Sequence, residues 1–211
     1  PCYVNSDPPQ REHERVPPAR LHGTVASMWL PFVWFNPWDA SAACTAASLD
    51  EKGRYELRIL GCVLPAVLKE PPTQVIKRES PDFEVLAGGA SFFVELVDAV
   101  PLAFSDSGTM NLDKRRSRPS SEMYHLEAGQ FGAVIASQIQ AKQEKASRWL
   151  NNEPSLKGKL ILGVNVGKGP RGITDYLRNP EMVAQMVPLS SIAPFQRIVL
   201  ADGSGAYVRR A

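Results

Sequence analysis

The stretch from residue 80 to residue 100, SPDFEVLAGGASFFVELVDAV, constrains the fold more than any other part of the chain. Gly88 and Gly89 separate two runs of alternating residues, which is typical of two strands joined by a two-residue turn with positive φ angles. This register places Asp82 directly opposite Glu95. Opposed side chains have Cβ atoms about 5 Å apart, so two like charges there are destabilising unless a cation offsets them. The hairpin therefore predicts a divalent-cation site.

The two faces of this hairpin differ in character. An exposed strand face normally carries charges of both signs, but this one carries Asp82, Glu84 and Glu95 and no cation. The other face is apolar and is expected to lie in the core; it comprises Phe83, Val85, Ala87, Phe92, Val94 and Leu96. Hard carboxylate oxygens suit Mg²⁺ or Mn²⁺ with substrate phosphate oxygens, so we expect a phosphodiester substrate. The alternative is a solvated hairpin whose acids are incidental.

Helices and strands are expected to alternate around the hairpin. A Ser-x-x-Glu capping box at Ser48 and Glu51 predicts a helix start, and Pro65 is expected to kink or shorten its last turn. The other expected elements are a strand at 74–76, a long helix at 121–150 weakened by Gly129 and Gly132, a strand at 159–166, a short helix at 174–187 interrupted by Pro180, and a hairpin of 195–200 with 206–209. This order predicts an α/β fold with a mixed sheet and helices on its faces.

Composition shifts suggest the domain organisation. Residues 1–47 are rich in proline and aromatic residues and are interpreted as an extended arm or a strap, while residues 48–211 form a single domain. The aromatic run at 29–38 is typical either of a platform for stacked bases or of an irregular strap packed on the domain, and we assign it no role. The polar segment at 103–120 predicts a mobile loop.

Charge and cysteine content indicate which cellular compartment and which classes of partner to expect. The net charge of +2 does not indicate a polyanion partner by itself, although residues 114–118 include four cations in five positions. The three cysteines lack metal-ligand spacing and are interpreted as free thiols, which favours the cytoplasm. The apolar stretch at 25–38 is broken by prolines and is too short to span a bilayer, so no membrane partner is expected.

The long helix is expected to place a lysine beside the hairpin acids. At 100° per residue, Lys142 falls near the middle of an inward-facing stripe about 80° wide. Burial beside Asp82 and Glu95 would pair its charge and let it orient a water nucleophile or stabilise a phosphorane. The alternative is a snorkelling side chain that returns to water. Gln138, on the same side, could hold a phosphate or a water, and Lys145 is expected to face solvent.

Pro81-Asp82, a glycine turn and Glu95 in an apolar strand together resemble the motif of the PD-(D/E)XK nuclease superfamily. The resemblance implies a restriction-endonuclease-like α-β-β-β-α-β core over residues 48–166, with an additional C-terminal helix and strands. It also implies that Asp82 and Glu95 bind Mg²⁺ and that Glu56, or in its place Glu51, is the third acid.

One position departs from that pattern. The family's lysine belongs two residues after the glutamate, where this chain has Val97. This chain resembles those members in which the lysine lies on the following helix instead, as it does in viral cap-snatching endonucleases. Lys142 fits that role. A degenerate, inactive member fits as well.

The expected function is therefore that of a metal-dependent nuclease acting on DNA or RNA. The alternative is a catalytically inactive nuclease-like module that binds nucleic acid or a protein partner, within a toxin or defence system; a homodimer is compatible with either. The residues expected to contact nucleic acid are Gln138, Lys145, Lys114, Arg115 and Arg116, because each phosphate contact adds salt-dependent affinity.

Overall fold

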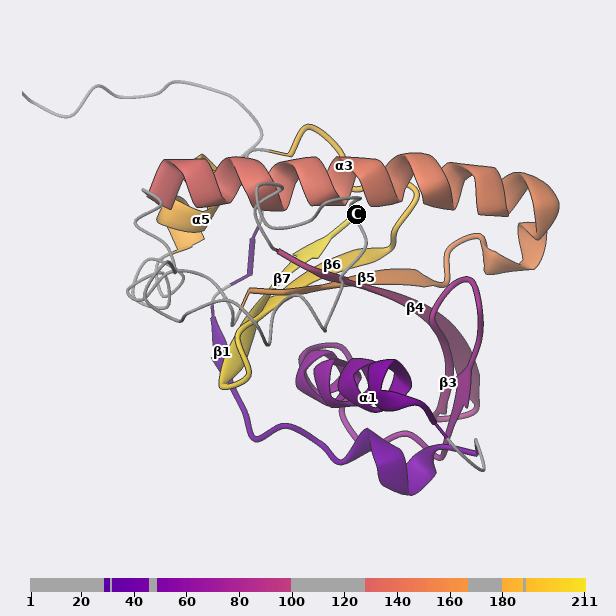
Figure 1. Cartoon of the computed structure of the whole chain (residues 1–211). Helices are drawn as coiled ribbons and strands as arrows, with labels where there is room; N and C mark the ends of the chain where they lie inside the picture. The colour runs from indigo at the N-terminus through magenta and orange to yellow at the C-terminus, as the bar shows by residue number, and fades with distance from the viewer. Residues whose placement is uncertain (1–28, 31, 46–48, 100–127, 167–179, 188) are drawn as a thin grey trace, which may run out of the picture.

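A computed structural model of the chain describes residues 29–30, 32–45, 49–99, 128–166, 180–187 and 189–211. It contains a seven-stranded mixed sheet with the strand order β1-β7-β6-β5-β4-β3-β2 (Figure 1). The elements in chain order are β1 (Val33–Trp34), η1 (Ala40–Ala43), α1 (Glu51–Val63), η2 (Leu64–Ala66), β2 (Gln74–Lys77), β3 (Phe83–Ala87), β4 (Ala90–Asp98), α3 (Ala128–Asn152), η5 (Pro154–Leu156), β5 (Leu160–Asn165), α5 (Pro180–Met186), β6 (Arg197–Ala201) and β7 (Gly205–Arg210). The expected α/β fold with a mixed sheet is confirmed.

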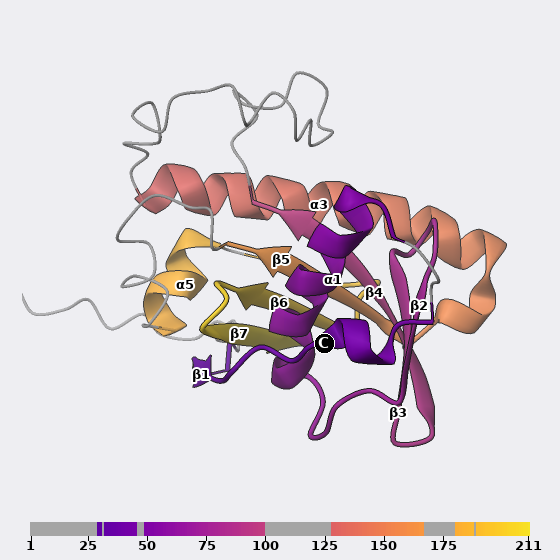
Figure 2. The same cartoon turned by 60° about the horizontal axis from the view of Figure 1, so that its bottom comes forward.

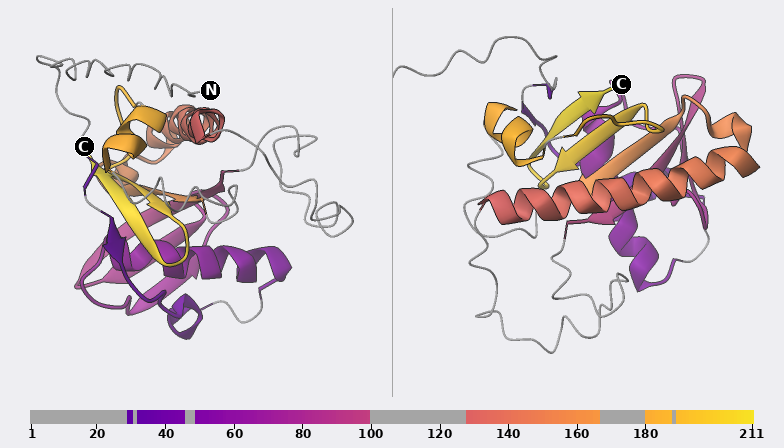
Figure 3. Two further views of the ribbon diagram at one scale, coloured as in Figure 1. Left: turned by 90° about the vertical axis from the view of Figure 1, so that its left-hand side faces the viewer. Right: turned by 90° about the horizontal axis from the view of Figure 1, so that it is seen from above.

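The sheet lies between two layers of helices. α1 covers one face, while α3 and α5 cover the other, as the turned views in Figures 2 and 3 also show. Two separate clusters of buried side chains match these layers. Phe131, Ile135 and Ile139 of α3 belong to one cluster, and Leu57 and Leu60 of α1 belong to the other. Both faces of the central strands are therefore buried, which agrees with the burial of every residue of β5.

The β3–β4 hairpin has the register that the sequence predicts. Phe83 pairs with Val94 and Ala87 pairs with Ala90, so the pairing closes around the two glycines. Gly88 and Gly89 have φ angles of 55° and 75°, as a primed turn requires. β2 extends the antiparallel pairing on the outer side of β3, and β5 lies parallel to β4 after the crossover through α3.

α1 begins later than the capping box predicted. Its N-cap is Asp50, whose side chain accepts a hydrogen bond of 2.7 Å from the Gly53 N–H, and Ser48 lies outside the described residues. Aspartate satisfies the free N–H groups of a first turn as well as serine does, so a suitable cap two residues further along can set the start. The other end agrees with expectation, because α1 stops at Val63 and Pro65 lies in the short 3₁₀ turn that follows.

The long helix is not interrupted at its two glycines, whereas the interruption expected at Pro180 falls at the edge of the described residues and stays a prediction. α3 runs continuously through Gly129 and Gly132. A Cβ on Gly132 would lie only 2.1 Å from the backbone oxygen of Met186, so the missing side chain lets α5 approach α3 closely. Pro180 begins α5, where its missing N–H costs no hydrogen bond, and residues 174–179 lie outside the described part.

The aromatic segment joins the edge of the sheet. The short strand β1 pairs with β7, and Trp29 is buried beside it. Val33 and Trp34 are exposed. Residues 1–28 and the predicted loop at 103–120 lie outside the described residues. Within the described part, none of the helices is both long and apolar enough to cross a membrane.

Candidate functional site

The hairpin brings Asp82 and Glu95 together. Asp82 stands immediately before β3, and its backbone N–H donates a 3.3 Å hydrogen bond to Glu95 Oε2. The N–H of Leu96 in turn donates to Asp82 Oδ2 at 2.8 Å. Each carboxylate is thus anchored by the backbone of the opposite strand, and Glu95 is only 1% exposed. The predicted juxtaposition of two acids is present, with their orientations fixed by main-chain donors.

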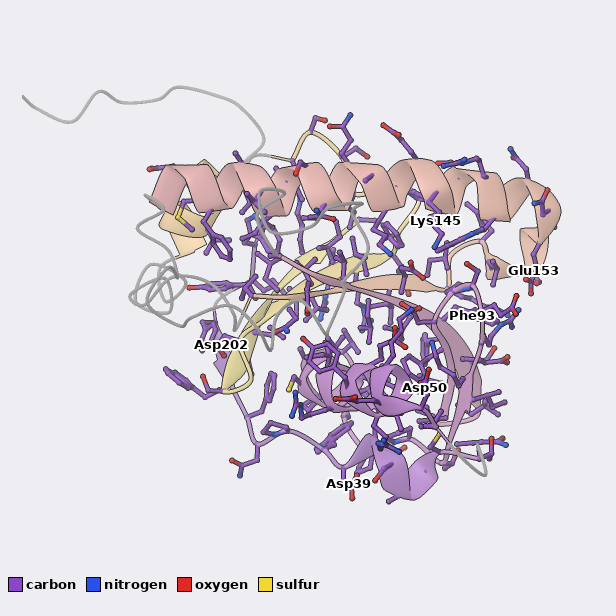
Figure 4. The ribbon with its side chains drawn as sticks, in the orientation of Figure 1. Asp39, Asp50, Phe93, Lys145, Glu153 and Asp202 are labelled. Atoms are coloured by element: carbon purple, nitrogen blue, oxygen red, sulfur yellow. The ribbon has the colours of Figure 1, made fainter. Side chains whose placement is uncertain are left out.

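α3 supplies two ammonium groups to Glu95. Lys142 Nζ lies 2.5 Å from Glu95 Oε1, so Lys142 occupies the inward position that helical periodicity predicts. Lys145 Nζ lies 3.4 Å from the same oxygen and 4.9 Å from the centroid of the Trp149 ring. In Figure 4, Lys145 lies on the side of α3 that faces the sheet around Phe93. Lys145 thus faces solvent only in part: its side chain is 44% exposed, and its ammonium group also contacts the buried acid.

Glu56 is linked to this pair through a lysine. Lys77 Nζ, from the end of β2, lies 2.9 Å from Glu56 Oε2 and 3.6 Å from Asp82 Oδ1, and it donates a 3.2 Å hydrogen bond to the Asp82 backbone oxygen. Glu56 Oε2 is buried without a hydrogen-bond partner of good geometry, so its contact with Lys77 is an ion pair only. Glu51, the competing candidate, is exposed in the first turn of α1.

Lys77 was missed by the sequence analysis. The predicted strand ended at residue 76, one residue too early, and so the last pair of β2 with β3 was not considered. In the structure Lys77 pairs with Phe83, the neighbour of Asp82. The register of this second antiparallel pair was the signal that could have identified Lys77.

Glu84, the remaining acid on the hairpin face, belongs to a different ion-pair network. Arg78 Nη1 donates to Glu84 Oε2 at 3.1 Å, and Arg78 Nη2 lies 3.2 Å from Glu153 Oε2 after the end of α3. The guanidinium carbon lies 5.0 Å from the centroid of the Phe93 ring. The cations that this face lacks in the hairpin sequence are thus supplied by neighbouring segments. Glu84 acts as a structural partner rather than as a member of the candidate site.

The donor set fits a divalent cation through two carboxylates. Asp82 and Glu95 offer hard oxygens in fixed orientations, and the buried Glu56 Oε2 that lacks a hydrogen bond is a third donor nearby. Over the described residues, however, no group of three or more His, Cys, Asp or Glu side chains is close enough to hold a metal ion. The Lys77 ammonium group lies between Glu56 and Asp82 and contacts both, so it separates the Glu56 carboxylate from that of Asp82.

The remaining predicted residues differ in their placement. Gln138 is half-buried on α3, one turn before Lys142. Lys114, Arg115 and Arg116 lie outside the described residues. Val97 packs against the apolar cluster under α3, so that strand position contributes to the core.

A second polar cluster was not expected from the sequence. The Tyr55 hydroxyl of α1 donates to the carboxylate of Asp98 at 2.8 Å, and the amide of Asn165 donates to Asp98 Oδ1 at 2.8 Å. Asp98 and Asn165 are paired at the ends of the parallel strands β4 and β5. The cluster ties α1 to both strands and thereby fixes the helix that carries Glu56.

Among the described residues, neither the cysteines nor a pocket beside α3 offers a competing site. Cys44 and Cys62 are free, and burial raises the pKa of the Cys62 thiol, which disfavours the nucleophilic thiolate. A pocket of about 820 Å³ lies between α3, α5 and residues 189–191 and is lined by neutral side chains such as Gln140 and Gln143. Its lining includes none of the acids described above.

Comparison of the chain with protein-family models, with curated proteins and with solved structures finds no match in any of the three. Its function is therefore inferred from its own residues.

Proposed function

We propose that this chain is a metal-dependent nuclease that hydrolyses phosphodiester bonds of DNA or RNA. The observation that carries the proposal is the buried Glu95 carboxylate, held beside Asp82 and contacted by Lys142 from the following helix. Acids and a lysine converging in this way are what the PD-(D/E)XK resemblance implies.

The element order supports the same proposal. α1, the antiparallel strands β2 to β4, the crossover helix α3 and the parallel strand β5 follow one another in the α-β-β-β-α-β order. We therefore propose a restriction-endonuclease-like core, to which α5, β6 and β7 are additions. β1 extends the sheet beyond β7.

In this proposal Asp82 and Glu95 hold Mg²⁺ or Mn²⁺, and Glu56 is the third acid. When bound, such a cation polarises a phosphoryl oxygen and lowers the pKa of a coordinated water. The Leu96 N–H keeps Asp82 oriented, so its carboxylate needs no reorganisation during the reaction. Lys142 orients the attacking water and stabilises the negative charge that develops on the phosphoryl oxygens.

Lys145 lies where it could neutralise a substrate phosphate. Its side chain is 44% exposed, twice the 22% of Lys142, although both ammonium groups contact Glu95. A partly exposed ammonium can exchange a carboxylate partner for a phosphate oxygen at low cost. We expect Lys145 to contribute salt-dependent affinity rather than the chemical step.

A second function is favoured by a separate observation. Each of the three acids already has an ammonium partner: Glu95 contacts Lys142 and Lys145, Asp82 contacts Lys77, and Glu56 contacts Lys77 and Lys52. The charges of the three acids are matched by Lys77, Lys142 and Lys145 without a metal, and the 70% exposed Lys52 is a fourth cation beside them. That balance suits an inactive nuclease-like module that binds nucleic acid or a protein partner.

One experiment separates these functions. Mg²⁺ and Mn²⁺ binding is measured by calorimetry on the wild type, on Asp82→Asn and on the control Glu144→Gln, an exposed acid of α3. Plasmid DNA and RNA cleavage is then followed for the same proteins and for Lys142→Met. The nuclease requires binding and cleavage that Asp82→Asn abolishes and Glu144→Gln retains. The absence of both metal binding and cleavage in the wild type would refute it and favour the inactive module.

A further inference from the structure

Lys77 occupies an unusual position between two of the proposed metal ligands. Its ammonium nitrogen lies 2.9 Å from Glu56 Oε2, 3.6 Å from Asp82 Oδ1 and 4.6 Å from the centroid of the Phe83 ring. Glu56 belongs to α1, Asp82 to the start of the hairpin and Lys77 to the edge strand β2. One cation thus serves two carboxylates from different elements.

The contacts of Lys77 with the two carboxylates are ion pairs rather than hydrogen bonds. The 3.6 Å separation from Asp82 Oδ1 exceeds hydrogen-bond length, and the approach to Glu56 Oε2 lacks hydrogen-bond geometry. Asp82 Oδ2, by contrast, is held by the Leu96 N–H at 2.8 Å. The arrangement therefore fixes the Asp82 carboxylate through its backbone donor, while the Lys77 ammonium group directs its hydrogen bond to the Asp82 backbone oxygen at 3.2 Å and makes none to either carboxylate.

We propose that Lys77 is a built-in competitor of the divalent cation. Its ammonium group neutralises Glu56 and Asp82 while the site holds no metal and moves aside when the cation binds, which lets Glu56 join Asp82 and Glu95. Lys77 thereby sets the cation concentration at which the site fills. This inference rests on the proposed function, because it concerns the loading of the same site.

The charge of Lys77 gives the size of the effect. One unit charge about 6 Å from a divalent ion in a water-like dielectric changes its affinity by about tenfold. Lys77→Met removes the charge and keeps an apolar stem over Phe83, so it is expected to tighten Mn²⁺ and Mg²⁺ binding by about tenfold. Lys77→Arg keeps the charge and is expected to bind close to the wild-type affinity.

Lys52 offers a matched control. Its ammonium group also contacts Glu56, at 3.5 Å, but the side chain is 70% exposed and the contact is with Glu56 alone among the acids of the site. Lys52→Met removes the same charge from the same acid without clearing the space beside Asp82. We expect this variant to change the cation affinity by less than about twofold, because an exposed charge is screened by solvent.

The experiment is calorimetric titration of the full chain with MnCl₂ and MgCl₂ for the wild type, Lys77→Met, Lys77→Arg and Lys52→Met. Tighter binding by Lys77→Met alone supports the competitor role. Binding that is equal to or weaker than wild type in Lys77→Met overturns this inference and leaves the nuclease proposal standing. Binding by Lys77→Met without any by the wild type supports the competitor role and contradicts the nuclease proposal, while no binding by any of the four proteins overturns both.

A second measurement uses the wild type and so does not depend on the folding of a variant. Amine-reactive labelling followed by mass spectrometry compares Lys77 and Lys52 with and without Mn²⁺. A cation that displaces Lys77 increases its labelling severalfold and leaves Lys52 unchanged. Unchanged labelling of Lys77 at saturating Mn²⁺ would overturn the displacement.

Discussion

Replacing Lys142 by methionine tests the ion pair on which the candidate site depends. The change removes the ammonium group 2.5 Å from Glu95 Oε1 and keeps a chain of similar length to cover the core. Glu95 then remains as a carboxylate that is 1% exposed with one fewer partner. We expect the free energy of unfolding at pH 7 to fall by about 2 kcal/mol.

The magnitude follows from the second lysine. Removing the sole partner of a buried charge costs about 3–5 kcal/mol, chiefly because the remaining charge is left uncompensated. Here Lys145 remains, with its ammonium nitrogen 3.4 Å from the same oxygen. At that distance and an effective dielectric constant of about 20, the attraction is still about 5 kcal/mol before desolvation is subtracted, so the loss should stay below the full range. Replacing Lys142 and Lys145 together should reach about 3–5 kcal/mol.

A double-mutant cycle measures the coupling directly. Urea unfolding is followed for the wild type, Lys142→Met, Glu95→Gln and the double variant, with the exposed Lys157→Met as the control for loss of a surface charge. In the Glu95→Gln background, Lys142→Met should change the free energy of unfolding by less than about 0.5 kcal/mol, because the charge that it would leave unpaired is gone. An equal cost in both backgrounds would refute the pairing, and a cost no larger than that of Lys157→Met would refute the burial argument.

Two further predictions concern positions outside the site. Burial raises the pKa of Tyr207 to about 12. An unfolded tyrosine loses its proton near pH 10, so stability should fall between pH 10 and 12 in the wild type but less steeply in Tyr207→Phe. Removing this buried hydroxyl, which has no hydrogen-bond partner among the described residues, should also add about 1 kcal/mol of stability at pH 8 in urea unfolding; parallel pH profiles would contradict the assignment. Gly132→Ala should lower stability by about 1 kcal/mol or more despite the better helix propensity of alanine, because its Cβ meets the Met186 backbone, and a rise in melting temperature would refute that packing.

The parts of the site that local sequence determines were predictable. Gly88 and Gly89 fix a two-residue turn, and the turn fixes which residues of the two strands meet. The inward position of Lys142 follows from the 3.6-residue period of a helix that must cover a sheet. Both inferences need only the spacing of residues within one segment.

The remaining parts depend on how separate segments pack. Lys77 reaches Asp82 only because β2 pairs with β3 in one register, and Lys145 reaches Glu95 only because α3 lies close above β4. The glycine at 132 illustrates the same limit, since its cost in an isolated helix is offset by the close approach of α5. Propensity and spacing give no information about such contacts between elements.

The packing of β4 against α3 also explains why the lysine of this site comes from the helix. Val97 points to the same side of β4 as Glu95 and packs into the apolar cluster formed with α3. Val97 is partly buried, and a lysine at this position would give up apolar contacts that the valine makes with that cluster, which would cost packing energy. The helix itself can deliver an ammonium group to Glu95 without that cost, because Lys142 lies at the border of the cluster and is partly exposed. Valine at position 97 is therefore accounted for by packing, and by itself it does not favour an inactive module over a nuclease.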